Sequence, residues 1–349
     1  MNRLILGDNL DILRTFEDES VDLIYLDPPF FSNRNYEVIW GDAGEIRSFQ
    51  DRWAGGMDHY IAWLKERVAE MYRVLKKTGS LFLHCDWHAN AYIRVHILDR
   101  IFGKENFRNE IIWKRTNAKG LAFTRLARNN DSIFYYSKSK KFIFNGQYAT
   151  HSEKYILDFY KHVDPETGRR YRLADLTNPN KARPNLTYDF LGVTRVWRWT
   201  KERMQEAYDD GLIVQAKPGA VPALKRYLDE QEGNPLDDNW LDIVNVQSTK
   251  EKIGYPTQKP EALLERIVNM ASNEGDVVLD PFMGGGTTIA VADKLGRKWI
   301  GIDQSVQAVK VTELRLDKQQ GLFSDPFSVL LHKYDYDTLR YKNAFAFES

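Results

Sequence analysis

The sequence has a single cysteine, no long apolar run and no net charge, and each absence argues against a class of protein. The lone cysteine, Cys85, cannot build an internal disulfide framework or a zinc cage of cysteine ligands. No apolar run approaches the ~20 residues of a membrane helix. The start, MNRLILGDNL, is too short and too soon acidic for a secretory signal. We therefore expect a cytoplasmic protein with no membrane partner.

The composition is that of a globular chain with an uneven distribution of charge. The 349 residues are 43% hydrophobic and 28% charged, enough for one large or two ordinary domains. Residues 100–226 hold 25 basic and 13 acidic side chains, a net charge of +12, and the remainder carries −12. A basic middle suggests a segment that faces a polyanion, while an uneven solvated surface explains the same numbers. Candidate phosphate contacts are Lys138, Lys140, Lys141, Arg169 and Arg170.

Strand and helix signals alternate over the first ~140 residues, as a mostly parallel α/β sheet requires. The predicted strands are 4–6, 21–26, 80–83, 111–113 and 132–136, and the predicted helices are 9–16, 58–77 (ended by Gly79) and 89–102. From about 145 to 245 the alternation of strand and helix signals stops, and only a helix over 201–209 is predicted. Order then returns with helices 262–271, 287–295 and one capped by Ser305, and with strands 277–279 and 299–303.

This pattern predicts an interrupted α/β domain. Its first part is residues 1–145 and its second part is residues 245–320. Residues 146–244 form an inserted, irregular region, and residues 321–349 are a C-terminal extension to which we assign no role.

The stretch YLDPPFFS places an acid, two prolines and an aromatic directly after a buried strand. The prolines stop the strand and stiffen the backbone, which leaves Asp27 at its carboxyl end, where open α/β sheets bind ligands. The Asp27 carboxylate and the Pro28 carbonyl offer two adjacent acceptors, which suit an exocyclic amine with two hydrogens. Phe30 offers a face on which a planar base can stack. By itself, a Pro-Pro turn that only ends a strand explains the stretch better.

A second strand–turn–helix segment, VVLDPFMGGGTTIAVADKLGRKWIGID, carries a glycine-rich turn. A P-loop needs Lys before Ser or Thr, but here Gly286 is followed directly by Thr287. A dinucleotide fingerprint needs a third glycine, and Ile289 stands in its place. The remaining interpretation is a nucleoside without pyrophosphate, such as S-adenosylmethionine. Asp303, at the end of the next strand, could then accept from both ribose hydroxyls.

Together these motifs resemble the beta group of S-adenosylmethionine-dependent DNA amino-methyltransferases, which modify adenine N6 or cytosine N4. That family pairs an N-terminal Asp-Pro-Pro-Phe/Tyr motif with a C-terminal Asp-Pro-Phe-x-Gly-x-Gly-Thr-Thr motif. This chain carries them at 27–30 and 280–288, with Gly7-Asp8 after the first strand and Pro-Thr-Gln-Lys-Pro at 256–260. Tyr255 stands where the family often has His. The resemblance covers about 1–140 and 245–318 and implies a Rossmann-like sheet with circularly ordered motifs and an inserted target-recognition region.

The resemblance also implies roles for individual residues. Asp27, Pro28, Pro29 and Phe30 would form the catalytic amine pocket, with Asp27 also near the cofactor. Asp8 would bond the cofactor's adenine amine, and Asp303 its ribose. The cofactor's remaining contacts would come from the Pro-Thr-Gln-Lys-Pro and glycine-loop motifs, namely Thr257, Gln258, Lys259, Asp280, Phe282, Gly284, Gly286, Thr287 and Thr288.

The acid in the amine motif favours adenine N6, because by resemblance Asp accompanies adenine and Ser accompanies cytosine N4. Methylation at cytosine C5 is rejected, since it needs a nucleophilic cysteine and Cys85 lacks the usual Pro-Cys setting. The expected activity is therefore site-specific methylation of a flipped-out adenine in double-stranded DNA. The same chemistry on cytosine N4 or RNA, or a non-catalytic DNA-binding subunit, stays open as an alternative.

Partners and metals follow more weakly from the sequence. The resemblance suggests a cognate restriction endonuclease and a homodimer as possible partners. His84, Asp86 and His88 alternate and would share one face of a strand, which could suggest a metal site. Methyl transfer to an amine needs no metal, so we expect none.

Overall fold

The computed structural model describes residues 2–31, 35–40, 45–50, 55–117, 124–246, 251–255, 257–319 and 326–332, with the backbone alone at 35–40 and 45–50. The chain forms two compact units, one of residues 1–146 with 237–349 and one of residues 147–236. No helix in the described ranges is both long and apolar enough to cross a membrane.

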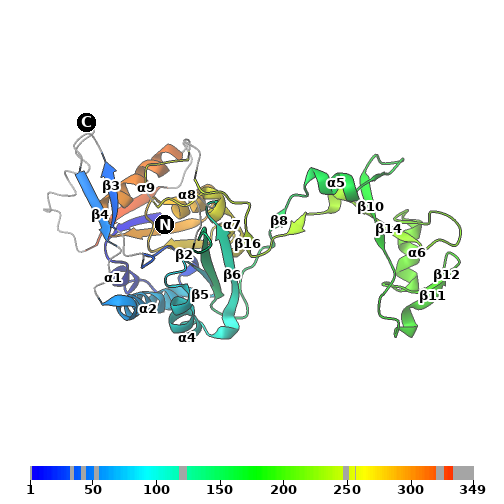
Figure 1. The fold of residues 1–349 in the computed structure, drawn as a ribbon, viewed down its shortest axis with the longest axis horizontal. Coiled ribbons are helices and arrows are strands. Elements are labelled where there is room, and N and C mark those ends of the chain that lie inside the picture. The colour runs from blue at the N-terminus through cyan, green and yellow to red at the C-terminus, as the bar shows by residue number, and fades with distance from the viewer. Residues whose placement is uncertain are drawn as a thin grey trace. The chain divides into compact units, whose positions relative to one another are not determined.

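The larger unit is built on one nine-stranded sheet (Figure 1). Its strands, in spatial order, are β16 (Asn239–Trp240), β6 (Phe107–Lys114), β7 (Asn130–Ser137), β5 (Leu75–Cys85), β2 (Val21–Leu26), β17 (Val277–Asp280), β18 (Lys298–Asp303), β1 (Asn2–Leu6) and β19 (Phe327–Leu331). All neighbours pair in parallel except β7, which runs antiparallel to both β5 and β6. A mostly parallel α/β sheet is therefore confirmed.

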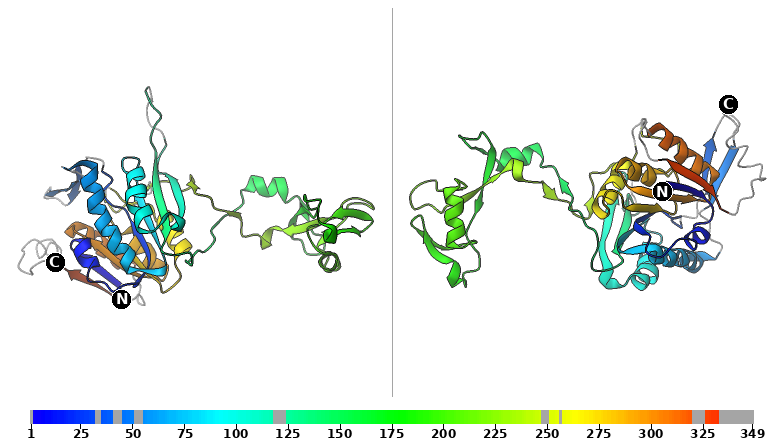
Figure 2. Two further views of the ribbon diagram at one scale, coloured as in Figure 1. Left: turned by 90° about the horizontal axis from the view of Figure 1, so that it is seen from below. Right: turned by 180° about the vertical axis from the view of Figure 1, so that it is seen from behind.

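Helices cover both faces of this sheet, and a separate core fills each side (Figure 2). One face packs against α1 (Asn9–Leu13), α2 (Gly56–Val74) and the segments α3 (Asn90–Ile93), η1 (Arg94–Leu98) and α4 (Asp99–Ile101). The other packs against α7 (Glu261–Ala271), α8 (Thr287–Lys294) and α9 (Val306–Gln319). Strand β2 shows the alternation, because Leu23 and Tyr25 enter one core while Ile24 and Leu26 enter the other. Two short elements complete the unit, the hairpin β3 (Asn35–Trp40) with β4 (Glu45–Gln50) and the 3-10 turn η2 (Lys104–Asn106).

Three of the predicted helices differ from the structure. Helix α1 ends at Leu13, and α2 ends at Val74 because Leu75 is already extended and the Ser20 amide bonds the Val74 carbonyl at 2.8 Å. Gly79 therefore lies within β5, where a Cβ would meet the Asp22 carbonyl at 2.7 Å, and not at the end of a helix. The predicted helix over 89–102 is interrupted by the π-helical turn η1.

The C-terminal region also contributes a strand that the sequence pattern did not predict. Strand β19 adds an edge in parallel to β1, and the His332 amide continues the pairing at the Leu6 carbonyl (2.9 Å). The predicted extension over 321–349 otherwise lies largely outside the described residues.

The smaller unit has its own sheets and core. Its elements are β8 (Tyr148–Ala149), α5 (Glu153–Phe159), β9 (His162–Val163), β10 (Arg170–Asp175), η3 (Pro184–Leu186), β11 (Thr187–Phe190), β12 (Val193–Val196), α6 (Lys201–Asp209), β13 (Ile213–Val214), β14 (Ala223–Tyr227), η4 (Leu228–Glu230) and β15 (Asn234–Pro235). Trp197 is fully buried among Leu176, Phe190 and Met204, and its indole donates to the Tyr188 carbonyl at 2.9 Å. Helix α6 lies where it was predicted.

Candidate functional site

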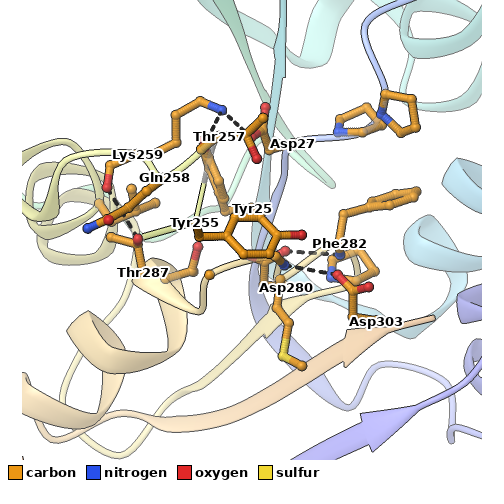
Figure 3. A pocket seen from close by; sticks show the side chains of 18 of the residues that line it. Tyr25, Asp27, Tyr255, Thr257, Gln258, Lys259, Asp280, Phe282, Thr287 and Asp303 are labelled. Carbon is orange, nitrogen blue, oxygen red and sulfur yellow. Dashed lines mark hydrogen bonds and ion pairs between the residues drawn. The ribbon is translucent and has the colours of Figure 1, made fainter. Parts of the chain in front are cut away.

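The carboxyl ends of the parallel strands converge on one pocket of about 410 Å³ (Figure 3). Asp27 follows β2, Asp280 ends β17 and Asp303 ends β18, and all three line this pocket. Its other walls come from the two predicted motifs and their surroundings: Pro28, Pro29, Phe30, Thr257, Gln258, Lys259, Phe282, Gly284, Thr287 and Thr288. The structure thus brings together residues that lie more than 270 positions apart in the chain.

Asp27 uses its two carboxylate oxygens differently. Lys259 Nζ bonds Oδ2, whereas Oδ1 is buried and has no hydrogen-bond partner among the described residues. The Pro-Pro turn is held from behind, because the Tyr60 hydroxyl donates to the Pro29 carbonyl at 2.7 Å. An unpaired buried acceptor is costly, so Asp27 Oδ1 fits a site that a donor from a ligand completes.

The glycine loop makes room for an aromatic side chain. Gly284 and Gly286 have φ of +49° and +69°, a region that favours glycine. A Cβ at Gly284 would meet the Tyr255 ring at 3.1 Å, and one at Gly286 would meet Thr312 at 2.4 Å. The loop therefore folds closely against Tyr255, which itself lines the pocket.

Three strand-end acids line the pocket, and burial weakens the acidity of two of them. Burial, with smaller contributions from the charges of Asp27 and Asp303, raises the pKa of Asp280 to about 7, against hydrogen bonds from Thr288 and the Phe282 amide. Burial likewise raises the pKa of Asp303, although the amides of Ser305 and Gly284 donate to it at 2.8 and 3.0 Å. Converging carboxylates of this kind stabilise a bound cation.

The segment 257–259 lines the pocket and is held by hydrogen bonds to residues 251–253 and to Thr287. Gln258 spans that loop, donating to the Glu251 carbonyl at 2.7 Å and accepting from the Ile253 amide at 3.0 Å. Its side chain is thus committed to holding the segment in place. The Lys259 carbonyl accepts from the Thr287 hydroxyl at 3.2 Å, and Thr257 lines the pocket beside it. Pro256 lies outside the described residues.

Among the described residues, Asp8 and Gly286 are the predicted cofactor contacts that do not line the pocket. The lining includes Gly285 and Thr287 on either side of Gly286, and Gly7 and Asn9 on either side of Asp8. Its carboxylate caps α1 at the Leu10 amide (2.8 Å), pairs with Arg67 (2.9 Å) and accepts from Gln304 (2.6 Å). Contact with the cofactor's adenine stays a prediction for Asp8.

Several lining residues were missed from the sequence. Among them are Tyr25, Trp63, Trp113, Arg115, Asp131 and Gln304. Asp131 lies near the start of β7, and because that strand is reversed, its start meets the carboxyl ends of β2 and β5. The polar residues that precede the predicted strand 132–136 were a signal, but only the antiparallel direction gives them meaning.

His84, Asp86 and His88 do not share a strand face. Strand β5 ends at Cys85, and Asp86 then turns to bond the His88 amide and ring at 2.9 and 2.7 Å. His84 is buried and bonds Tyr25 and Asp131 instead. Across the described residues, no group of three or more His, Cys, Asp or Glu side chains could hold a metal ion.

The whole arrangement suits a cationic nucleoside beside a planar amine. Three carboxylates face the pocket, Phe282 contributes an aromatic wall, and Trp63 lies 5.8 Å from the Phe282 ring between centroids. The free oxygen of Asp27 and the Phe30 ring lie at the same pocket, ready for an amine and its base.

Comparison with known proteins agrees with this geometry. A family described as DNA methylase matches residues 21–314. The type II methyltransferase M.EcaI from Enterobacter cloacae is 28% identical over 344 residues, covering 95% of this chain and 73% of that protein. The DNA adenine methyltransferase YhdJ from Escherichia coli (strain K12) is 29% identical over 316 residues, covering 90% and 82%.

Solved structures share the fold. The cytosine-N4-specific PvuII DNA methyltransferase superposes with a TM-score of 0.51 at 15% identity, over 93% of this chain and 89% of that one. TTHA0409 from Thermus thermophilus, complexed with S-adenosyl-L-methionine, gives 0.50 at 19% identity, over 96% and 100%. At these identities the likeness supports the fold alone.

Proposed function

Because the chain belongs to the DNA methylase family, and is thus a DNA methyltransferase that uses S-adenosylmethionine, we propose that it methylates adenine N6 at specific sites in double-stranded DNA. The observation that carries this proposal is Asp27 Oδ1, a buried acceptor with no partner among the described residues. It lies in the same pocket as the glycine loop and Asp303.

The pocket residues fit the cofactor, which supplies an electrophilic methyl group on a sulfonium. We assign its ribose to Asp303 and its adenosine wall to Phe282 and the loop of Gly284 and Gly286. Asp280 would face the sulfonium end, where its negative charge would complement the cation. Thr257, Thr287 and Thr288 would line the remainder, and Lys259 would remain with Asp27.

Asp27 would act on the amine of the base. The amine lone pair is delocalised into the ring, which makes the nitrogen a poor nucleophile. Acceptors at Asp27 Oδ1 and the Pro28 carbonyl draw its hydrogens out of the ring plane and free the lone pair. The carboxylate interaction strengthens as the nitrogen becomes cationic, so it stabilises the transition state more than the ground state. Phe30 would stack on the extruded base, which has to leave the duplex to reach the pocket.

Adenine is favoured over cytosine by the residue at position 27. A carboxylate there matches the resemblance to adenine-specific members, and the relative YhdJ is named a DNA adenine methyltransferase. The relative M.EcaI is named a type II methyltransferase, which supports action at a defined site.

Methyl transfer from labelled cofactor to unmodified genomic DNA, followed by nucleoside analysis, tests the proposal. Label in N6-methyladenine is expected. Label in N4-methylcytosine would overturn the base, label only in RNA would overturn the substrate, and no label with cofactor still bound would favour a non-catalytic subunit. Asp303→Ala serves as a second probe, since it should mainly weaken cofactor binding.

Further proposals rest on the resemblance. Residues 147–236, within the predicted 146–244 insertion, would recognise the target sequence, between catalytic parts 1–145 and 245–320. We also propose that the protein has a cognate restriction endonuclease, forms a homodimer and is cytoplasmic. Light scattering of the purified chain, and a nuclease gene beside its own, would test the two partners.

A further inference from the structure

A buried polar chain lies directly behind the Asp27 carboxylate. His84, fully buried at the end of β5, bonds the Tyr25 hydroxyl through Nδ1 (2.9 Å) and Asp131 Oδ2 through Nε2 (3.2 Å). Arg115 Nε lies 3.4 Å from the other oxygen of Asp131. Nothing in the assigned amine chemistry uses these residues, yet burying such groups is costly unless they are paired.

The bonding pattern assigns the tautomer of His84. Burial, followed by the charges of Asp27, Asp280 and Asp131, raises the pKa of Tyr25 well above its ordinary value, so Tyr25 keeps its proton, and we assign its hydroxyl as the donor to Nδ1. The ring therefore carries its hydrogen on Nε2 and donates it to Asp131. Burial alone would raise the pKa of Asp131, but the hydrogen bond and charge of His84, with the charges of Arg115 and Lys259, lower it.

The His84 ring stands between two carboxylates. His84 Nδ1 is 3.9 Å from Asp27 Oδ1, about 1 Å longer than a hydrogen bond. The Phe30 and Trp113 rings pack against the imidazole, with centroids 5.5 and 5.6 Å away. The charged or titratable groups that face it are thus Tyr25 and Asp27 from the β2 end and Asp131 from β7, with Arg115 and Lys259 one step beyond.

Amine methylation leaves a proton that the pocket must move. The amine lone pair forms the N–C bond while the S–C bonding pair stays on sulfur, and the nitrogen then carries one hydrogen too many. We propose that Asp27 takes this proton and passes it to His84 Nδ1 as the Tyr25 hydroxyl turns its hydrogen away from that nitrogen, with Asp131 stabilising the resulting imidazolium. His84 and Asp131 are then positioning residues that act through Asp27, an assignment that rests on the proposed methylation.

Kinetics of conservative variants test the relay. In single-turnover methylation from pH 5 to 9, His84→Gln and Asp131→Asn should each lower the rate constant about 10- to 100-fold, with cofactor Kd changed less than about twofold. At saturating cofactor, the relay predicts a rate that depends on the protonation state of the His84 ring, and His84→Gln should lose that dependence. The double variant should be no slower than either single variant, because the two side chains act as one unit. His88→Gln, a nearby histidine outside the pocket, should match the wild type.

A second measurement does not depend on activity. Imidazole nitrogen NMR of the cofactor-bound chain should show His84 taking up a proton between pH 5 and 9, at lower pH in Asp131→Asn. A His84 ring that stays neutral throughout, additive single variants, or rate losses matched by losses in cofactor affinity would each overturn the relay. If the wild type labels no DNA, the proposed function fails, and the NMR titration still decides whether His84 can accept a proton.

Discussion

Buried carboxylates in the pocket and in the smaller unit differ in how completely they are hydrogen-bonded. In the pocket, one oxygen each of Asp27 and Asp131 is buried without a hydrogen-bond partner among the described residues. In the smaller unit, Asp164 accepts from both Lys225 (2.8 Å) and the Tyr227 hydroxyl (2.5 Å), and the amide of Glu166 adds a third bond at 3.1 Å. Because an unsatisfied buried oxygen destabilises the fold, its persistence at the sheet edge indicates a place for a ligand.

Positive charge is distributed unevenly between the smaller unit and the residues that precede it. Residues 147–236 hold 14 basic and 13 acidic side chains, whereas residues 100–146 hold 11 basic and 3 acidic ones. Arg169, a candidate phosphate contact, is paired with Asp229 (2.7 Å) and Glu230 (2.6 Å), and the Lys138 amine donates to the Leu75 carbonyl at 2.5 Å. The basic excess therefore lies mainly before the smaller unit, and part of it stabilises the fold.

The largest expected effect comes from removing the free acceptor. Asp27→Ala should lower methyl transfer by at least about 10³-fold, since it removes the group that stabilises the cationic amine. Cofactor affinity should change less than about threefold, because other residues hold the nucleoside. Single-turnover labelling and calorimetry measure the two quantities. Full transfer by this variant would show that the amine is activated elsewhere.

Disrupting the core of the smaller unit should unfold that unit without affecting cofactor binding by the larger one. Trp197→Ala removes a fully buried indole and should destabilise this unit by about 3–5 kcal/mol. Limited proteolysis of the full chain should then cut within 147–236, while cofactor affinity stays the same. Lost cofactor binding would mean that the larger unit depends on the smaller one.

Much of the larger unit could be predicted because strand periodicity and the two motifs are local signals. Val21–Leu26 and Asn9 begin where the pattern placed them, and the two acid-tipped motif strands do meet. The ends of helices were less predictable, since contacts from distant residues decide them. Val74 ends α2 because the segment before β2 bonds its carbonyl.

The relay behind Asp27 could not be found from spacing. His84, Asp131 and Arg115 come from different strands or their ends, and only the reversal of β7 brings them together. The role of Gln258 was similarly hidden, because a side chain that bonds its own loop leaves no periodic signal. The family resemblance placed the motifs but said nothing about which of their atoms were already bonded.

The raised pKa of Asp280 predicts a pH-dependent affinity for the cationic cofactor. With the pKa of Asp280 raised to about 7, a sulfonium that prefers the ionised carboxylate should bind about tenfold more tightly at pH 8 than at pH 6. The same raised pKa affects the free energy of unfolding in the opposite direction, because the folded protein binds the Asp280 proton more tightly than the unfolded chain does. The Asp280 contribution to stability is full below about pH 4 and is lost as the pH rises towards 7.

Calorimetry at pH 6, 7 and 8 checks the affinity, and two controls isolate its cause. Asp280→Asn should flatten the dependence. S-adenosylhomocysteine, a neutral thioether, should bind the wild-type protein with little change over this range. An equal pH dependence for both ligands would assign the titration to another group.

The smallest expected effect is on DNA affinity, and it compares an arginine without a carboxylate partner among the described residues with one that is paired. Arg128 lies over the ring of Trp87 at 3.5 Å, and Trp87 is 45% exposed, so this cation stands at the surface without a carboxylate partner in the described part of the chain. Arg128→Ala should weaken binding to unmodified duplex DNA about three- to tenfold and lower the salt slope by about 1. Arg169→Ala should leave both unchanged, because its guanidinium is already neutralised by two carboxylates. Fluorescence anisotropy over a salt series measures the DNA affinity of both variants. The reverse outcome would show that the smaller unit, and not residues 100–146, contacts the DNA phosphates.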